Sequence, residues 1–202
     1  MNDAIPAAHA TVGRRNVLAA SGIGALAALW PAGQASAQGT PPGHTVFDVA
    51  CLGGTFSANF GEAIDADGGD FRGVGFFVEG LLYPEGTIPD GDGFDPASAE
   101  ATGLWLCRGW FMFHPDRPLP HVVTTQEYLF GAVSGDNPSP ADQLVSSGLE
   151  GGVSETVRSA IGGTGRFRHH SGEVVQQVIG TNTTVLRDIG EHAPNFRFTF
   201  RK

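Results

Sequence analysis

Short apolar runs, separated by turn-forming residues, follow one another along most of the chain. After residue 37, nine segments are rich in Val, Phe, Thr and Tyr and are bounded by Gly, Pro, Asn or Asp. Such runs are typical of β-strands joined by turns. Eight or nine short strands in one domain predict a closed barrel or a sandwich. The predicted strands are residues 45–51, 54–60, 72–82, 103–113, 121–131, 143–149, 155–161, 172–181 and 195–201.

Two longer segments interrupt the strand pattern, at residues 83–101 and 134–142. Both are rich in Pro and Gly, which do not fit the ladder positions of a strand. We therefore expect two long loops on one barrel, with no linker that would divide the domain.

The segment "LWLCRGWFMF" at 104–113 is apolar on both faces of the predicted strand. One face of a barrel strand lines the interior, so an apolar second face predicts contact with another subunit or a covering element. We expect a homo-oligomer. The two faces are Leu104, Leu106, Arg108, Trp110 and Met112, and Trp105, Cys107, Gly109, Phe111 and Phe113.

The N-terminal region has the pattern of an export signal. Arg14 and Arg15 precede an apolar run that ends near Trp30, and Ala35 and Ala37 supply the small residues of a cleavage site. The paired arginines resemble the twin-arginine type. A membrane anchor would need about 20 apolar residues, more than this run offers. We predict a signal at 1–37, one mature domain at 38–202, and a periplasmic or secreted location.

Charge narrows the choice of partners. The chain has 21 acidic and 12 basic residues and a net charge of −9 at pH 7. An acidic surface repels phosphate backbones and anionic lipids. We expect neither nucleic acid nor, after signal cleavage, a membrane as a partner.

The two cysteines, Cys51 and Cys107, both lie in apolar strand-like runs. An exported protein can keep a disulfide. Free cysteine also packs well as a small apolar side chain. Pairing and two buried thiols both remain open.

Lone charged residues in apolar runs are the candidates for a site. Arg108 is either a polar group in a pocket or one partner of an ion pair. A glutamate buried in such a pocket would have a raised pKa, which suits proton transfer. We assign catalytic roles to Arg108, Glu79, Glu127 and Tyr128, and ligand binding to Gln126, Trp110, Phe111 and Asn182.

The stretch "AIGGTGRFRHHSGEV" at 160–174 concentrates glycines before two arginines. A phosphate-binding loop would be followed by a helix, but the β-branched residues at 174–179 predict a strand. We interpret Gly162, Gly163, Thr164 and Gly165 as a structural turn at the rim of the barrel.

This stretch resembles the signature of the dirigent and allene oxide cyclase-like barrels, and the C-terminal "NFRFTFRK" resembles the closing strand of that group. His169 and His170 differ from the small residues usual there. The resemblance implies an eight-stranded antiparallel up-and-down β-barrel, often trimeric, with an apolar cavity open at one end and no cofactor. It also implies binding of a small hydrophobic or phenolic molecule, whose cyclisation, isomerisation or coupling the protein steers.

Other functions remain as alternatives. The barrel could bind a ligand without catalysis or serve only a structural role. A cupin-like metal enzyme would use His114, Asp116 and His121, or His169, His170 and Glu173. The acidic turns at 65–70 and 90–95 share the pattern D-x-D-G-x-D, but neither completes a calcium loop, so we interpret both as solvated turns.

Overall fold

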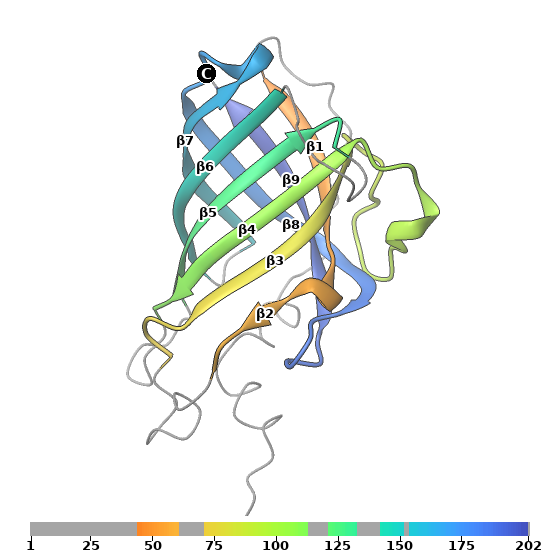
Figure 1. Cartoon of the computed structure of the whole chain (residues 1–202). Helices are drawn as coiled ribbons and strands as arrows, with labels where there is room; N and C mark the ends of the chain where they lie inside the picture. Colours follow the sequence, from red (N-terminus) through yellow and green to blue (C-terminus); the bar gives the residue numbers. More distant parts are fainter. Residues whose placement is uncertain (1–43, 61–70, 113–120, 133–141, 152–153, 202) are drawn as a thin grey trace, which may run out of the picture.

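The computed structural model describes residues 44–60, 71–112, 121–132, 142–151 and 154–201. Within these ranges the chain forms a closed antiparallel barrel of eight strands, with one short additional strand at the edge of β3 (Figure 1). The barrel predicted from the strand pattern is therefore confirmed. The predicted signal at 1–37, the acidic turn at 65–70, and the candidate metal ligands His114 and Asp116 lie outside the described residues.

Consecutive strands of the barrel are neighbours in the sheet, as in an up-and-down barrel. β1 pairs with both β9 and β3, which closes the sheet on itself. The barrel strands are β1 (Thr45–Cys51), β3 (Gly75–Pro84), β4 (Gly103–Phe111), β5 (His121–Phe130), β6 (Asp142–Gly151), β7 (Glu155–Thr164), β8 (Gly172–Val185) and β9 (His192–Arg201), and the additional strand is β2 (Ser57–Ala58).

The segment 54–60 differs from its prediction as a full strand. Residues Gly53–Thr55 form a 3₁₀ turn, η1, and only Ser57–Ala58 pair with β3. The Thr55 hydroxyl donates to the Leu52 carbonyl oxygen at 2.7 Å and accepts the Glu79 backbone N–H at 2.9 Å. These side-chain hydrogen bonds hold the backbone in a turn where a strand was expected.

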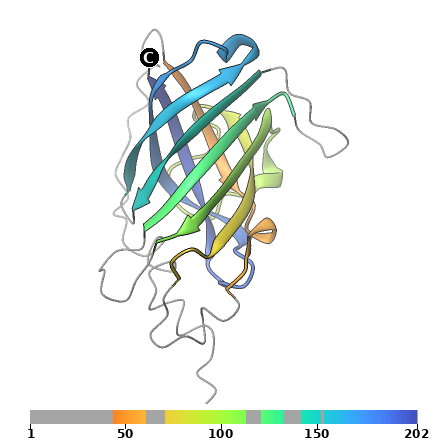
Figure 2. The same cartoon turned by 60° about the vertical axis from the view of Figure 1, so that its left-hand side comes forward.

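The end of the barrel that holds the C-terminus is packed with aromatic rings. Phe47 on β1 lies against Tyr128, Phe198 and Phe200, with ring centroids 5.2 to 5.8 Å apart. The 3₁₀ turn η4 (Gly165–Phe167) covers this end (Figure 2) and places Phe167 against Phe130 and His170. This end of the interior is filled by side chains.

The glycines of the 160–165 stretch lie where the backbone requires them. Gly162 has a φ of +143° beside a bulge between β6 and β7. A Cβ on Gly163 would lie 2.4 Å from the Gln143 carbonyl oxygen. A side chain at either position would strain or displace the end of β7, which leads into η4. The predicted turn at 162–165 is therefore corrected: Gly162, Gly163 and Thr164 are the last residues of β7, and Gly165 begins η4.

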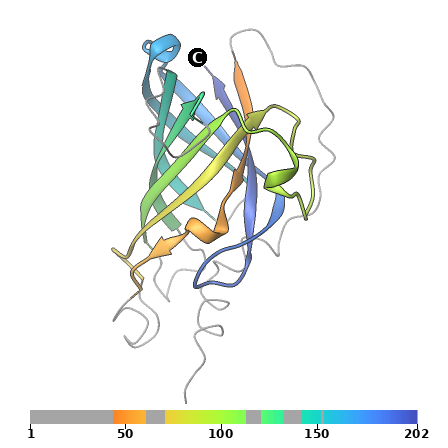
Figure 3. The same ribbon diagram turned by 45° about the vertical axis from the view of Figure 1, so that its right-hand side comes forward.

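The loop that follows β3 packs on the outside of the barrel (Figure 3). Ile88 is fully buried in a cluster with Tyr83 and Ile179, and Tyr83 donates its hydroxyl to the Pro96 carbonyl oxygen at 2.7 Å. Asp48 accepts the Ile88 N–H at 3.1 Å and pairs with Arg197. This loop is thus a covering element for the outer faces of β1, β3 and β8.

Apolar side chains remain exposed elsewhere on the outer face. Trp110 is 53% exposed, and Leu149, Val157 and Ile161 are exposed to a similar extent. The expected homo-oligomer stays a prediction. Within the described ranges, no helix has the length and apolar character that a membrane span requires.

Of the two alternatives for the cysteines, the structure has buried free thiols. Cys51 lies on β1 and Cys107 on β4, and β3 separates these two strands in the sheet. Burial raises the pKa of Cys51 to about 12 and also raises the pKa of Cys107. Both groups are therefore protonated thiols near neutral pH.

We predict that stability does not depend on reductant. The melting temperature should be equal with and without dithiothreitol, because no disulfide restricts the unfolded chain. Neither thiol should be alkylated by iodoacetamide in the native protein, whereas both should react after denaturation. A melting temperature that falls on reduction would contradict this assignment.

Candidate functional site

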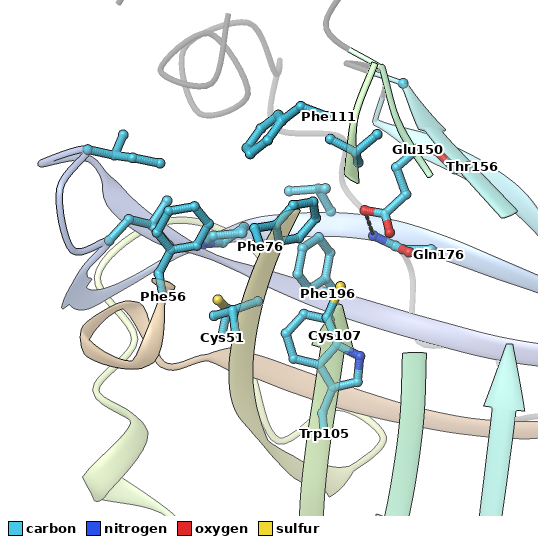
Figure 4. Close-up of a pocket in the computed structure, with 17 residues that line it drawn as sticks. Cys51, Phe56, Phe76, Trp105, Cys107, Phe111, Glu150, Thr156, Gln176 and Phe196 are labelled. Carbon is cyan, nitrogen blue, oxygen red and sulfur yellow. Dashed lines mark hydrogen bonds between the residues drawn. The ribbon is translucent and has the colours of Figure 1, made fainter. Parts of the chain in front are cut away.

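A cavity of about 140 Å³ lies inside the barrel, near the end opposite the C-terminus (Figure 4). Most of its wall is apolar. Polar side chains meet it on one side, where β6, β7 and β8 supply Glu150, Thr156 and Gln176. Its aromatic and sulfur-bearing lining residues are Phe56, Phe76, Trp105, Phe111, Phe196, Cys51 and Cys107.

The size of the cavity limits what it can enclose. An apolar protein cavity of about 150 Å³ holds a benzene molecule. The cavity therefore accommodates about one aromatic ring.

A charged pair lies beside the cavity, with Arg158 on β7 and Glu150 on β6. The Arg158 side chain is 0% exposed, whereas that of Glu150 is 19% exposed and lines the cavity. Arg158 also donates from Nη2 to the Thr124 carbonyl oxygen and from Nη1 to Gln176 Oε1, both at 3.3 Å. The positive charge is thus buried behind the carboxylate.

Gly148 makes room for the Arg158 side chain. A Cβ on Gly148 would lie 3.3 Å from the Arg158 Cβ, which is tight for two side chains on adjacent strands. The absence of a side chain on β6 at this position lets Arg158 run along the inner wall of the barrel.

Gln126 is fully buried and connects the charged pair to the rest of the interior. Its Oε1 accepts the Tyr128 hydroxyl at 2.7 Å and the Trp105 indole N–H at 3.3 Å. Its Nε2 donates to Glu150 Oε1 at 2.8 Å and to Gln176 Oε1 at 3.1 Å. All four hydrogen-bonding positions of this amide are used.

The Glu150 carboxylate receives hydrogen bonds on both oxygens. Oε1 accepts from Arg158, from Gln126 and from the Thr124 hydroxyl, the last at 2.5 Å. Oε2 accepts from Gln176 Nε2 at 3.2 Å. Because every partner donates, the carboxylate is held as an acceptor in the wall of the cavity.

Two thiols and a phenol near the Arg158–Glu150 pair are held in their neutral forms. Burial raises the pKa values of Cys51, Cys107 and Tyr128 above their ordinary values, and the negative charge of Glu150 adds to each increase. Thiolate or phenolate chemistry at these residues is therefore disfavoured near neutral pH.

Three of the sequence-predicted site residues lie inside the barrel. Phe111 lines the cavity. Gln126 lies behind Glu150, and Tyr128 lies behind Gln126, where its hydroxyl also contacts Ser146 Oγ at 3.0 Å. Gln126 and Tyr128 thus support the cavity wall and do not line it.

Of the other predicted residues, four lie on the outer side of the barrel and Asn182 is buried. Arg108 is exposed and pairs with Glu127 through a 2.7 Å contact. Glu79 and Trp110 share the outward side of their strands. Asn182 donates to the Cys51 carbonyl oxygen and to Asn195 Oδ1, and so joins β8 to β1 and β9. None of these five residues is part of the cavity wall.

Sequence reasoning missed Glu150, Arg158 and Gln176. On β6 the apolar residues Val145 and Leu149 suggest an inward face, but they point outwards, and Leu149 is exposed. The inward face of that strand instead carries Leu144, Ser146 and Glu150. The signal that was available is an arginine between Thr156 and Ala160, in a strand whose one other charged residue, Glu155, stands at its first position.

The alternative of a metal site gains no support from the geometry. Among the residues that the structure describes, no group of three or more His, Cys, Asp or Glu side chains is placed to hold a metal ion. His169 accepts a hydrogen bond from Arg168 Nε, and His170 packs on Phe167 and Phe200.

The sequence matches no protein-family model and no curated protein. Solved structures do resemble it. The pterocarpan synthase dirigent protein GePTS1 matches with a TM-score of 0.51 at 11% identity, over 77% of this chain and 80% of that one. The pterocarpan synthase dirigent protein PsPTS1 matches with a TM-score of 0.48 at 13% identity, over 78% and 94% of the two chains.

A pyocyanin demethylase also matches, with a TM-score of 0.46 at 13% identity, over 77% of this chain and 97% of that one. At such low sequence identities, a structural similarity is evidence for the fold alone. The barrel of this protein is dirigent-like, as the glycine-rich stretch and the closing strand predicted.

Proposed function

We propose that this protein binds a small hydrophobic or phenolic molecule in the barrel cavity and steers its cyclisation, isomerisation or coupling. The observation that carries the proposal is an apolar cavity of about one ring's volume whose wall contains one fixed carboxylate, Glu150. The dirigent-like fold is consistent with this function.

The apolar wall would contribute by restricting the shape of the ligand. A flexible reactive molecule that closes on itself gains rate and stereoselectivity when it is held in one conformation. Trp105 and Phe111 approach the cavity from β4 and Phe196 approaches it from β9, so they define which face of a bound ring is covered. Exclusion of water by these rings would also suppress hydrolysis of a reactive intermediate.

Glu150 would contribute by accepting a proton or a hydrogen bond from the ligand. Its Oε1 is occupied by three donors, while Oε2 has one and lies in the cavity wall. As a phenolic proton moves towards Oε2, the phenolic oxygen becomes a better nucleophile for closing a ring. The proton returns from the carboxylic acid to the product or to solvent, so no net charge accumulates.

Binding without catalysis is the second candidate function. Among the lining residues that lie in the described ranges, Glu150 is the one ionisable group besides the two thiols, whose pKa values are raised. A site with a single acid or base has no built-in pair for proton donation and acceptance. Product stereochemistry separates the two functions, because a carrier leaves the enantiomeric ratio of a spontaneous reaction unchanged.

Export and assembly belong to the same proposal. The twin-arginine pattern at residues 14 and 15 supports export to the periplasm or beyond. Exposed Trp110, Leu149 and Val157 support a homo-oligomer in which the outer face of the barrel is covered.

Filling the cavity should abolish its function. Val78 is buried in the cavity wall, and Val78→Phe would place a ring where the ligand binds. We expect at least a tenfold loss of affinity for phenol in calorimetry, and a destabilisation of about 1 to 3 kcal/mol from overpacking. With a phenolic quinone methide that cyclises spontaneously, the enantiomeric excess produced by the wild-type protein should fall towards zero.

The matched control is Val157→Phe, the same substitution at an outer position that is 55% exposed. It should keep both affinity and enantiomeric excess. If wild-type protein binds phenol but leaves the enantiomeric ratio unchanged for all such substrates, the carrier function replaces the steering function.

Removing Arg108 should leave the cavity intact. Its side chain is 54% exposed and its ion pair with Glu127 lies on the outer face, so Arg108→Ala should cost no more than about 1 kcal/mol in unfolding free energy. Phenol affinity should remain within about twofold of wild type. A selective loss of ligand binding with normal stability would restore Arg108 to the site.

A further inference from the structure

We infer that the cavity selects its ligand by hydrogen-bond polarity: it takes an aromatic molecule that presents an O–H or N–H donor, neutral or cationic, and rejects aromatic carboxylates. The inference rests on the proposed function, because it concerns the ligand of the same cavity. Its basis is a hydrogen-bond network with Trp105 at one end and Arg158 at the other. Both groups can only donate, so they determine which atoms of the network are donors and which are acceptors.

The first fixed end is Trp105. An indole nitrogen can only donate, and Trp105 Nε1 lies 3.3 Å from Gln126 Oε1. The Tyr128 hydroxyl donates to the same oxygen. The Gln126 amide is therefore oriented with Oε1 towards these two donors, so its Nε2 must point towards Glu150 and Gln176.

The second fixed end is Arg158. A guanidinium also can only donate, and Arg158 Nη1 donates to both Glu150 and Gln176 Oε1. Gln176 Oε1 thus accepts from Arg158 and from Gln126. This orients the Gln176 amide with Nε2 towards Glu150 Oε2, at 3.2 Å.

The two ends together fix Glu150 as the acceptor of the network. Donors from Thr124, Gln126, Arg158 and Gln176 converge on its carboxylate, and Glu150 lines the cavity. A carboxylate has about four lone-pair sites in all, so Oε2, with one donor, keeps capacity for a hydrogen bond from a ligand.

The charge distribution reinforces this selection. The Arg158 guanidinium is fully buried and is not part of the cavity wall, and no Lys, Arg or His among the residues that the structure describes lines the cavity. Thr156 and Gln176 add polar atoms but no positive charge. A ligand carboxylate would lose its hydration and meet the Glu150 charge in a poorly screened environment.

Two pairs of nearly isosteric probes test the inference on the wild-type protein by titration calorimetry. Benzamide and benzoate have the same shape, but one offers an N–H donor and the other a negative charge. Phenol and fluorobenzene differ by the O–H donor. We expect benzamide to bind at least tenfold more tightly than benzoate, and phenol about tenfold more tightly than fluorobenzene, as for one hydrogen bond to a charged group.

The outcomes separate the two proposals. Binding of phenol and fluorobenzene with equal affinity, or of benzoate as tightly as benzamide, overturns the polarity inference and leaves the ligand cavity standing. Failure of all four probes to bind overturns the proposed ligand cavity itself, and the inference with it.

Variants locate the effect at one residue. Glu150→Gln removes the charge at the cavity wall, so the ratio of benzamide to benzoate affinity should fall towards one. Glu173→Gln makes the same change at an exposed residue near the other end of the barrel and should keep the wild-type ratio. An unchanged ratio in a folded Glu150→Gln protein overturns the assignment to Glu150. If loss of the counter-charge to Arg158 prevents folding, the wild-type probe pairs still decide the question.

Discussion

The burial of Arg158 inside an apolar barrel is the constraint on which the arrangement of β5, β6, β7 and β8 depends. A guanidinium with no exposed surface must be paired and hydrogen-bonded, because an unpaired buried charge costs several kcal/mol. Its partners come from β5, β6 and β8, on both sides of its own strand. The pairing register of β5, β6, β7 and β8 therefore depends on one side chain. Glu150 is the member of this arrangement that lines the cavity.

One end of the barrel interior is filled by side chains and the other contains the cavity, because residues of different size face inwards at the two ends. Towards the C-terminal end, Phe47, Phe198 and Phe200 fill the interior with rings. Towards the other end, the inward positions of β1 and β4 carry the small side chains Cys51 and Cys107, and β6 carries Glu150 where a ring would fill the space. The cavity follows from this change in side-chain volume along strands of regular geometry.

Local patterns in the sequence were sufficient for the barrel but only partly for the site. Strand positions follow from runs of β-branched and aromatic residues, and the glycine-rich stretch led to the family likeness. The inward-facing side chains were harder to predict, because β4 is apolar on both faces and β6 exposes its apolar residue Leu149 to solvent. Which face turns inwards is decided by barrel closure and by the outer loop that buries Ile88. Arg108 and Arg158 are alike as isolated arginines in apolar strands, and only the closed sheet puts one outside with Glu127 and the other inside with Glu150.

A buried hydrogen-bond network that holds one carboxylate in place suits steering better than covalent chemistry. Gln126 has no free hydrogen-bonding position, and burial keeps Tyr128 and both thiols neutral, so these groups gain nothing by reacting with a ligand. What they provide is rigidity: Glu150 cannot turn away from the cavity without breaking hydrogen bonds to Thr124, Gln126 and Arg158. A carboxylate held in one orientation beside fixed aromatic walls presents a bound molecule with a single preferred pose, and stereocontrol requires a single pose and little else.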